Sequence, residues 1–262
     1  MVTRKMTQDP VFDSKIYERD IYQDSVYSAW LKNSNERDVL EQVFRDRTSW
    51  WCKDALSILD IGCGTGSAAG RLFSILNQQG FSYDYTGVDP YQDQLDRFRE
   101  AFPEQKVMNL ICSKVEDFSP SRTYDFTMAV HALYYVDSFE EILKKIHATA
   151  PKSVVVHHGK FGMNEVHQKF RQHVKKGPHI ISTWEDVQKS LDATGIPYTS
   201  EVRDTEVNVS SCKDPENSEG RKLIKFFLER SELPEYIIKS VSSWFATRPD
   251  VMKQDVGYFF IG

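Results

Sequence analysis

The feature that most constrains this chain is a glycine-rich turn that follows a short apolar run. The run at residues 55–61 leads directly into Gly62-Cys63-Gly64-Thr65-Gly66. A short apolar run that ends in glycines is typical of a buried parallel strand. Alternate glycines let the backbone approach a ligand closely and adopt positive φ angles. A helix that begins after such a turn offers unpaired N–H groups to polar ligand atoms. The turn therefore predicts a ligand site at the carboxyl end of the first strand.

The rest of the chain alternates between apolar runs and helical periodicity. Strands are expected at residues 55–61, 83–89, 107–112, 124–130, 153–157, 198–209 and 256–261. Helices are expected at residues 67–79, 92–102, 139–149, 165–174, 184–194, 221–230 and 235–245. Alternating strands and helices indicate an α/β fold, in which helices cover both faces of a parallel sheet. The pattern predicts a seven-stranded, mostly parallel sheet.

Two carboxylates give the glycine turn its chemical character. Asp89 ends the second expected strand, about 20 residues beyond the glycines, where an acidic side chain can accept hydrogen bonds from ribose hydroxyls. Asp60 precedes Gly62 by two residues, and the turn lacks the further glycine that lets a helix close over a pyrophosphate. A carboxylate at position 60 would repel a pyrophosphate but suits a methionyl amine, directly or through a water. These details favour a methyl donor; another nucleotide or a purely structural turn is the alternative.

With this motif the chain resembles the class I S-adenosylmethionine-dependent methyltransferases. Two further stretches carry the resemblance, residues 113–118 after the third strand and residues 124–136 around the fourth. The resemblance implies a Rossmann-like fold and S-adenosyl-L-methionine as the cofactor. It also implies that the loop after the third strand lies beside the adenine and that the fourth strand leads into the active site.

Within that superfamily the chain is similar to histamine N-methyltransferase and its relatives. The carrying residues are Val88-Asp89-Pro90 with Gln94, and Leu133-Tyr134-Tyr135-Val136; residues 182–187 and 257–261 support them. The resemblance, together with the glycine motif, assigns the cofactor to Asp60, Gly62, Gly64, Gly66, Asp89, Pro90, Gln94, Ser113, Val115 and His131. It assigns the substrate to Tyr27, Glu36, His131, Tyr134, Tyr135 and Gln254, with Asp255 as an alternative to Gln254. His158 and His167 are added as candidate substrate contacts from their place at and after the end of the fifth strand. The catalytic residues are then His131, Glu36 and Tyr135.

Three positions depart from the histamine N-methyltransferase pattern. His131 stands where that family has glutamine, and Met163 and His167 stand where it has two tryptophans that sandwich the ligand. We therefore expect methyl transfer to a nitrogen of a small amine or imidazole-type molecule other than histamine. His131 or Glu36 would take the proton of the acceptor. Transfer to the oxygen, carbon or sulfur of a small phenol, acid or thiol, or a non-catalytic cofactor-binding relative, is the alternative.

Histidines cluster after the fifth strand. His157, His158, His167, His173 and His179 follow one another within 23 residues. They fit three roles: contacts to an anionic substrate group together with Lys175 and Lys176, ligands of a metal ion, or ordinary surface side chains. No HxxxH or HExxH spacing completes a metal motif. The sequence therefore predicts no metal, and His131 is the histidine most expected in the site.

Composition excludes several classes of partner. The net charge is −5, with no basic cluster of the kind that binds nucleic acid. Neither a signal peptide nor an apolar run long enough to span a bilayer is evident, and the four cysteines form no CxxC pair. We expect a cytoplasmic monomer that acts on a small molecule. Residues 1–262 would form one domain, with a helical cap at 15–50, a cofactor-binding half at 51–160, and a substrate-side half with a lid insert at 161–262.

Overall fold

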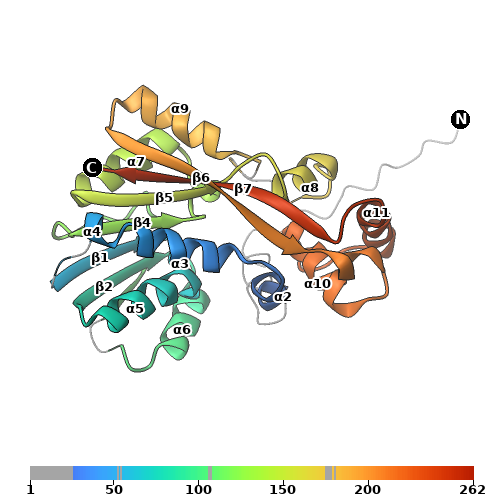
Figure 1. The fold of residues 1–262 in the computed structure, drawn as a ribbon, viewed down its shortest axis with the longest axis horizontal. Coiled ribbons are helices and arrows are strands. Elements are labelled where there is room, and N and C mark those ends of the chain that lie inside the picture. The colour runs from blue at the N-terminus through green and yellow to red at the C-terminus, as the bar shows by residue number, and fades with distance from the viewer. Residues whose placement is uncertain (1–25, 52, 54, 106–107, 175–178, 180) are drawn as a thin grey trace, which may run out of the picture.

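A seven-stranded mixed sheet forms the centre of the protein (Figure 1). The computed structural model describes residues 26–51, 53, 55–105, 108–174, 179 and 181–262. Across the sheet the strands are β3 (Met108–Cys112), β2 (Ser82–Asp89), β1 (Ala55–Ile61), β4 (Phe126–Val130), β5 (Lys152–His158), β7 (Val251–Ile261) and β6 (Tyr198–Asn208). β7 runs antiparallel to both of its neighbours, and the other strand pairs are parallel. The expected mostly parallel, Rossmann-like α/β fold is thereby confirmed.

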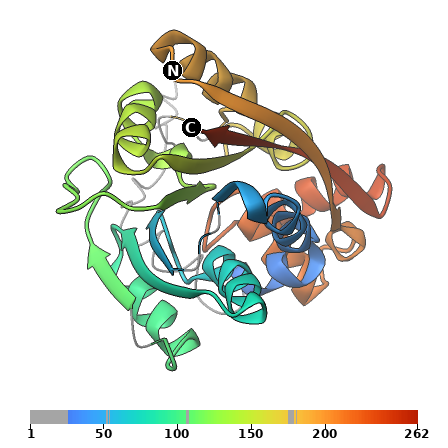
Figure 2. The same cartoon turned by 60° about the vertical axis from the view of Figure 1, so that its left-hand side comes forward.

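Helices cover both faces of this sheet (Figures 1 and 2). One face packs against α3 (Glu36–Asp46), α4 (Thr48–Trp51), α5 (Ser67–Gln79) and α6 (Gln92–Ala101), and the other against α7 (Phe139–Thr149) and α9 (Trp184–Thr194). Successive strand residues point to opposite faces, so Ile58 joins the first core and Leu59 the second. Because both faces are covered, the central strands are apolar throughout rather than alternating.

A third apolar core lies beyond one end of the sheet. It joins α2 (Val26–Asn33), α8 (Met163–Lys169), α10 (Ser218–Phe227) and α11 (Glu235–Ala246), and β6 and β7 extend far enough to reach it (Figure 1). Trp30 stacks on Phe226 at 4.9 Å between ring centroids, which joins the N-terminal helix to α10. Segments from the two ends of the chain thus build one helical layer. In the described part of the chain, no helix has the length and apolarity needed to cross a membrane.

Several element boundaries differ from the expectations. β7 begins at residue 251 rather than 256, since residues 251–255 continue the ladder with β6. α10 begins three residues early because the Asn217 side chain accepts hydrogen bonds from the amides of Glu219 and Gly220, which caps the helix. α8 ends at Lys169 instead of reaching residue 174. The first part of the expected cap, residues 15–25, lies outside the described residues.

Candidate active site

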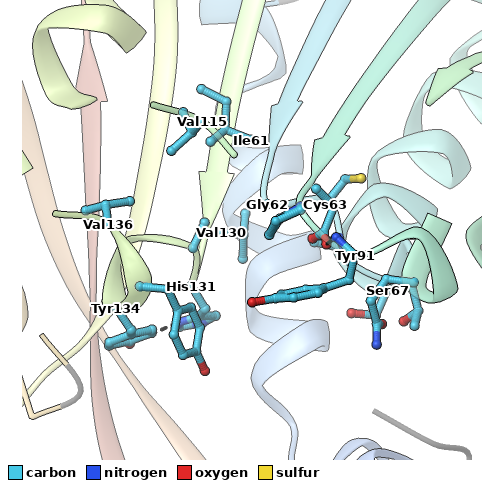
Figure 3. A pocket seen from close by; sticks show the side chains of 18 of the residues that line it. Ile61, Gly62, Cys63, Ser67, Tyr91, Val115, Val130, His131, Tyr134 and Val136 are labelled. Atoms are coloured by element: carbon cyan, nitrogen blue, oxygen red, sulfur yellow. Dashed lines mark hydrogen bonds between the residues drawn. The ribbon is translucent and has the colours of Figure 1, made fainter. Parts of the chain in front are cut away.

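A cavity of about 630 Å³ opens at the carboxyl edge of the sheet. Between β1 and β4 the strand order reverses, because the chain continues from β1 to β2 on one side while β4 lies on the other. Ligands of open α/β sheets bind in the crevice at such a point. Gly62 follows β1 and His131 follows β4, so these two predicted residues meet across the crevice (Figure 3).

The glycine turn after β1 allows close backbone approach. Gly62 has a φ of +70°, and a Cβ there would lie 2.5 Å from the Cβ of Ala132. Gly64 also has a positive φ and lines the cavity. Gly66 does not line it: a Cβ at Gly66 would lie 2.6 Å from Phe102, so this glycine serves packing against α6. A contact between Gly66 and the cofactor stays a prediction, although this glycine lies outside the cavity lining.

Asp89 ties the end of β2 to the glycine turn. Its Oδ2 accepts a hydrogen bond from the amide of Gly64 at 3.0 Å, and its Oδ1 accepts one from the amide of Tyr91 at 3.0 Å. Gln94 on α6 is buried along the same cavity wall, and its Oε1 has no hydrogen-bond partner among the described residues. An unsatisfied buried acceptor is costly, so Gln94 fits a ligand that brings a donor. Pro90, Ser113 and Val115 line the same end of the cavity.

Asp60 lies beneath the turn and is almost fully buried. Its Oδ2 accepts a hydrogen bond from the Tyr85 hydroxyl at 2.6 Å. Burial raises the pKa of Asp60 to about 8, and the nearby Asp89 carboxylate acts in the same direction, while the Tyr85 hydrogen bond and Arg37 oppose them. A buried acid that lines the cavity in this way gains most from a ligand that carries a positive charge.

Glu36 occupies the other part of the cavity at the start of α3, with 2% of the residue exposed. Each carboxylate oxygen has two nitrogen neighbours. Oε1 lies 2.8 Å from Nη1 of Arg37 and 3.1 Å from Nε2 of His131. Oε2 lies 2.6 Å from Nε2 of His158 and 3.1 Å from Nε2 of Gln254. We call Glu36, His131 and His158 the Glu36 cluster.

The Glu36 cluster has opposite effects on its members' pKa values. Burial acts to raise the pKa of Glu36, but the charge interactions and hydrogen bonds with His131 and His158 outweigh it and hold the pKa well below its usual value. Burial lowers the pKa of His131 to about 4, against the influence of Glu36. At neutral pH the cavity therefore presents an ionised carboxylate beside a neutral imidazole. His131 has a φ of +54°, a strained conformation of the kind that gathers at functional sites.

Ligand-type atoms of the Glu36 cluster lie within 4.8 Å of one another, which invites comparison with a metal centre. A shared Zn²⁺ at about 2.0–2.1 Å from each ligand requires the imidazole lone pairs to converge. The two imidazole rings instead stack at 4.1 Å between centroids, tilted by 29°, and approach different oxygens of Glu36. Arg37 also places a positive charge on that carboxylate. The geometry therefore fits a carboxylate–imidazole group in which His158 is hydrogen-bonded to Glu36, whereas Nε2 of His131 lies close to Glu36 without a hydrogen-bond partner among the described residues.

Aromatic side chains form a further part of the cavity lining, which we call the aromatic wall. The cavity is lined here by Tyr27, Trp30, Tyr134, Tyr135 and Phe226. The hydroxyl of Tyr134 accepts a hydrogen bond from the amide of His158 at 2.8 Å and lies 3.4 Å from Nδ1 of His131 (Figure 3). The more exposed Tyr135 donates a hydrogen bond to Glu229 at 3.3 Å. His167, Met163 and Asn164 from α8 complete this end of the cavity.

Some expected substrate contacts lie elsewhere. Gln254 does not line the cavity; it is buried behind Glu36, where its amide nitrogen contacts Glu36 and Thr205. Of the five histidines at 157–179, His158 and His167 line the cavity. His157 is buried against Tyr134 at 4.1 Å between centroids, away from the cavity. Lys175 and Lys176 lie outside the described residues.

Arg37 is a cavity residue that the sequence did not indicate. This half-buried guanidinium lines the cavity between the glycine turn and Glu36, with hydrogen bonds to Glu36, Tyr27 and Ser67. Glu-Arg neighbours at a helix start usually lie in solvent, so the sequence offered no signal that this pair is turned inward.

The donor end of the cavity combines three kinds of polar group. Asp89 is a carboxylate that can bind hydroxyl groups, Gln94 is an unsatisfied acceptor, and Asp60 is an acid suited to a cation. These residues fit an adenosyl group that carries a charged amino-acid end.

Comparison with known proteins agrees with this geometry. Residues 33–192, more than half of the chain, match a family described as "Methyltransferase domain". A stretch of 97 residues is 30% identical to the polyketide synthase–nonribosomal peptide synthetase ffsA of Aspergillus flavipes; it covers 35% of this chain and 2% of that protein. The chain thus spans a very small part of that relative's length.

Solved structures share the fold at low sequence identity. A putative methyltransferase from Bacillus halodurans superposes with a TM-score of 0.60 at 10% identity, over 87% of this chain and 98% of that one. Mycolic acid cyclopropane synthase CmaA1, complexed with SAH, gives 0.58 at 12% identity over 97% and 99%. Coclaurine N-methyltransferase, bound to N-methylheliamine and SAH, gives 0.53 at 13% over 86% and 71%. From the matching family, the fold and the glycine turn with its carboxylates, the chain belongs to the methyltransferase domain family and is an S-adenosylmethionine-dependent methyltransferase.

Proposed function

We propose that this enzyme methylates a nitrogen of a small amine or imidazole-type molecule held between the Glu36 cluster and the aromatic wall. The observation that carries the proposal is the pairing of an ionised Glu36 with a neutral His131 beside the donor site. A carboxylate attracts a basic nitrogen, and aromatic faces stabilise its positive charge by cation–π attraction. Coclaurine N-methyltransferase, which shares the fold, is bound to N-methylheliamine in its solved structure, so the fold is compatible with such acceptors.

The roles of the individual residues follow from the chemistry of the methyl donor. S-adenosylmethionine supplies a methyl group on a sulfonium, a leaving group that is already activated, so the protein mainly has to position and desolvate the acceptor. Asp60, Gly62, Gly64, Asp89, Pro90, Gln94, Ser113 and Val115 would hold the donor. An attacking nitrogen must be unprotonated, and neutral His131 and the ionised Glu36 beside it are the groups that can accept its proton. The resulting imidazolium would lie 3.1 Å from Glu36 Oε1, which stabilises it.

The tyrosines orient the acceptor in this proposal. Tyr134 bridges the two histidines, because its hydroxyl contacts both the His158 amide and His131 Nδ1. Tyr135 stands at the exposed side of the cavity, where its hydroxyl reaches Glu229. Burial raises the pKa of Glu229 to about 8, so this second carboxyl group is largely uncharged at neutral pH. Tyr27, His158 and His167 contact the acceptor from the remaining sides.

The test is steady-state turnover of a panel of amines, imidazoles, phenols, acids and thiols, with S-adenosylhomocysteine affinity measured separately. We expect turnover of a basic nitrogen compound, and at least 100-fold loss of kcat in His131→Ala, as for removal of a general base. His147→Ala, at an exposed position on α7, is the matched control and should leave kcat unchanged. Turnover of phenols, acids or thiols alone would contradict the proposed nitrogen acceptor, and an unaffected His131→Ala enzyme would remove that residue from the mechanism.

A further inference from the structure

Arg37 lines the cavity and has hydrogen-bonding capacity that the described residues do not use. A guanidinium carries five N–H groups in a planar fork. Three of them are engaged within the described residues: Nη1 donates to Glu36 Oε1 at 2.8 Å, Nε to Ser67 Oγ at 3.2 Å, and Nη2 to the Tyr27 hydroxyl at 3.4 Å. One N–H therefore remains on each terminal nitrogen for a further acceptor, and a carboxylate is the acceptor that a guanidinium binds most strongly.

The charges around Arg37 indicate which kind of ligand would bind there. The carboxyl groups that line the cavity include that of Glu36, which contacts Arg37, and those of Asp60 and Asp89 at the glycine turn. Among the described residues that line the cavity, the arginine and lysine cations are Arg37 and Lys114. Lys114 is exposed and follows β3, whereas Arg37 is 13% exposed in its side chain and contacts Ser67 at the start of α5. Arg37 is thus the less exposed of the two cations, and its contact with Ser67 places it beside the turn.

The methyl donor carries a zwitterionic amino-acid end, which needs one partner of each sign. Asp60 suits the ammonium, but a carboxylate brought beside Glu36, Asp60 and Asp89 is repelled unless a cation compensates it. Desolvated like charges are expensive, and a guanidinium between them removes that cost. Arg37 already bridges Glu36 and the first residue of α5.

We propose that Arg37 binds the α-carboxylate of S-adenosylmethionine and separates it electrostatically from Glu36. A single guanidinium then serves both halves of the site: it completes the donor pocket, and its hydrogen bond holds Oε1 of Glu36 in place. Two consecutive residues of α3 would therefore have different ligands, Glu36 the methyl acceptor and Arg37 the methyl donor. This inference depends on the cofactor and not on the identity of the acceptor.

The experiment compares two ligands by isothermal titration calorimetry. S-adenosylhomocysteine has the amino-acid end, and 5′-methylthioadenosine keeps the adenosine and the sulfur without it. Arg37→Met retains the length of the stem and removes the charge. We expect it to weaken S-adenosylhomocysteine about 10- to 100-fold, as for loss of a charge-assisted hydrogen bond, and 5′-methylthioadenosine less than about twofold. Arg37→Lys, which keeps the charge but loses the fork, should lie between.

Lys114→Met is the matched control, because it removes the other cation of the cavity lining. It should affect both ligands alike. An equal loss of both ligands in Arg37→Met would show that Arg37 only supports the fold, and unchanged affinity for both would show that it is no ligand. Either result overturns the assignment. Binding of 5′-methylthioadenosine also reports on folding of each variant, and Arg37→Lys provides the comparison if Arg37→Met is unstable.

Discussion

The buried carboxyl group of Asp60 makes donor binding pH-dependent. Burial raises the pKa of Asp60 to about 8, so the unliganded protein holds this group largely protonated at neutral pH. A protonated acid cannot form an ion pair with the ammonium of the donor. Binding should therefore release a proton from Asp60. The affinity should increase with pH as long as Asp60 is protonated in the unliganded protein, because its deprotonation then costs free energy.

The expected size follows from the ionisation of Asp60. With a pKa of about 8, Asp60 is ionised in about 1% of the unliganded protein at pH 6 and in about half of it at pH 8. Affinity for S-adenosylhomocysteine should thus rise about 50-fold between these values, or about 2.3 kcal/mol. At higher pH the affinity should level off once Asp60 is ionised, and it should fall where the ligand amine, which belongs to a free amino acid, loses its proton.

Calorimetry of S-adenosylhomocysteine from pH 6 to 9, in buffers of different ionisation enthalpy, measures both affinity and proton release. About one proton should be released per ligand near pH 6.5. Asp60→Asn is the control, and its affinity should stay nearly constant from pH 6 to 8, because the ligand amine keeps its proton over this range. A pH-independent wild-type affinity without proton release would refute the reasoning.

The same ionisation affects the unliganded fold. Because the folded pKa of Asp60 lies above its ordinary value of 3.8, its contribution to stability is full below pH 3.8 and is lost as the pH rises towards about 8. The thermal shift produced by S-adenosylhomocysteine should accordingly be larger at pH 8 than at pH 6.

Three further predictions concern single substitutions. Gly62→Ala places a side chain at a positive φ and 2.5 Å from the Cβ of Ala132. It should lower the free energy of unfolding in urea by about 1–3 kcal/mol and weaken S-adenosylhomocysteine binding at least about tenfold. Gly80→Ala, at a similar φ in open space, should lower stability without weakening binding. Glu36→Gln should lower kcat/KM at least about 100-fold while the calorimetric affinity for S-adenosylhomocysteine stays within about threefold, and equal losses of both would contradict an acceptor role. Phe98→Ala, which empties a fully buried site, should cost about 3–5 kcal/mol in denaturant unfolding with an unchanged m-value, and a loss below about 1 kcal/mol would contradict the packing described here.

The donor half of the site could be predicted because its residues lie next to strand ends. Gly62 follows β1 and Asp89 ends β2, and parallel pairing brings both to the same edge of the sheet. Sequence patterns did not predict hydrogen bonds between side chains and partners that lie far away in the sequence. Asn35 directly precedes α3, and asparagine is a favoured capping residue there, but its Oδ1 accepts a hydrogen bond from the amide of Glu206 on β6 at 2.7 Å. Gln254 was expected to contact substrate, but β7 places it behind Glu36.

The sequence by itself determined the sheet, the glycine turn and the acidic residue across from it. The reason is that the apolar period, the glycine spacing and the succession of strands and helices along the chain are local properties. Only the tertiary structure decided that Glu36 and His158, separated by 122 positions, share a hydrogen bond, and that Arg37 is turned towards the cavity. The physical reason is that burial and charge proximity depend on how α3, β4 and β5 pack together. They change the pKa values of Glu36 and His131 in ways that no pattern along one segment encodes.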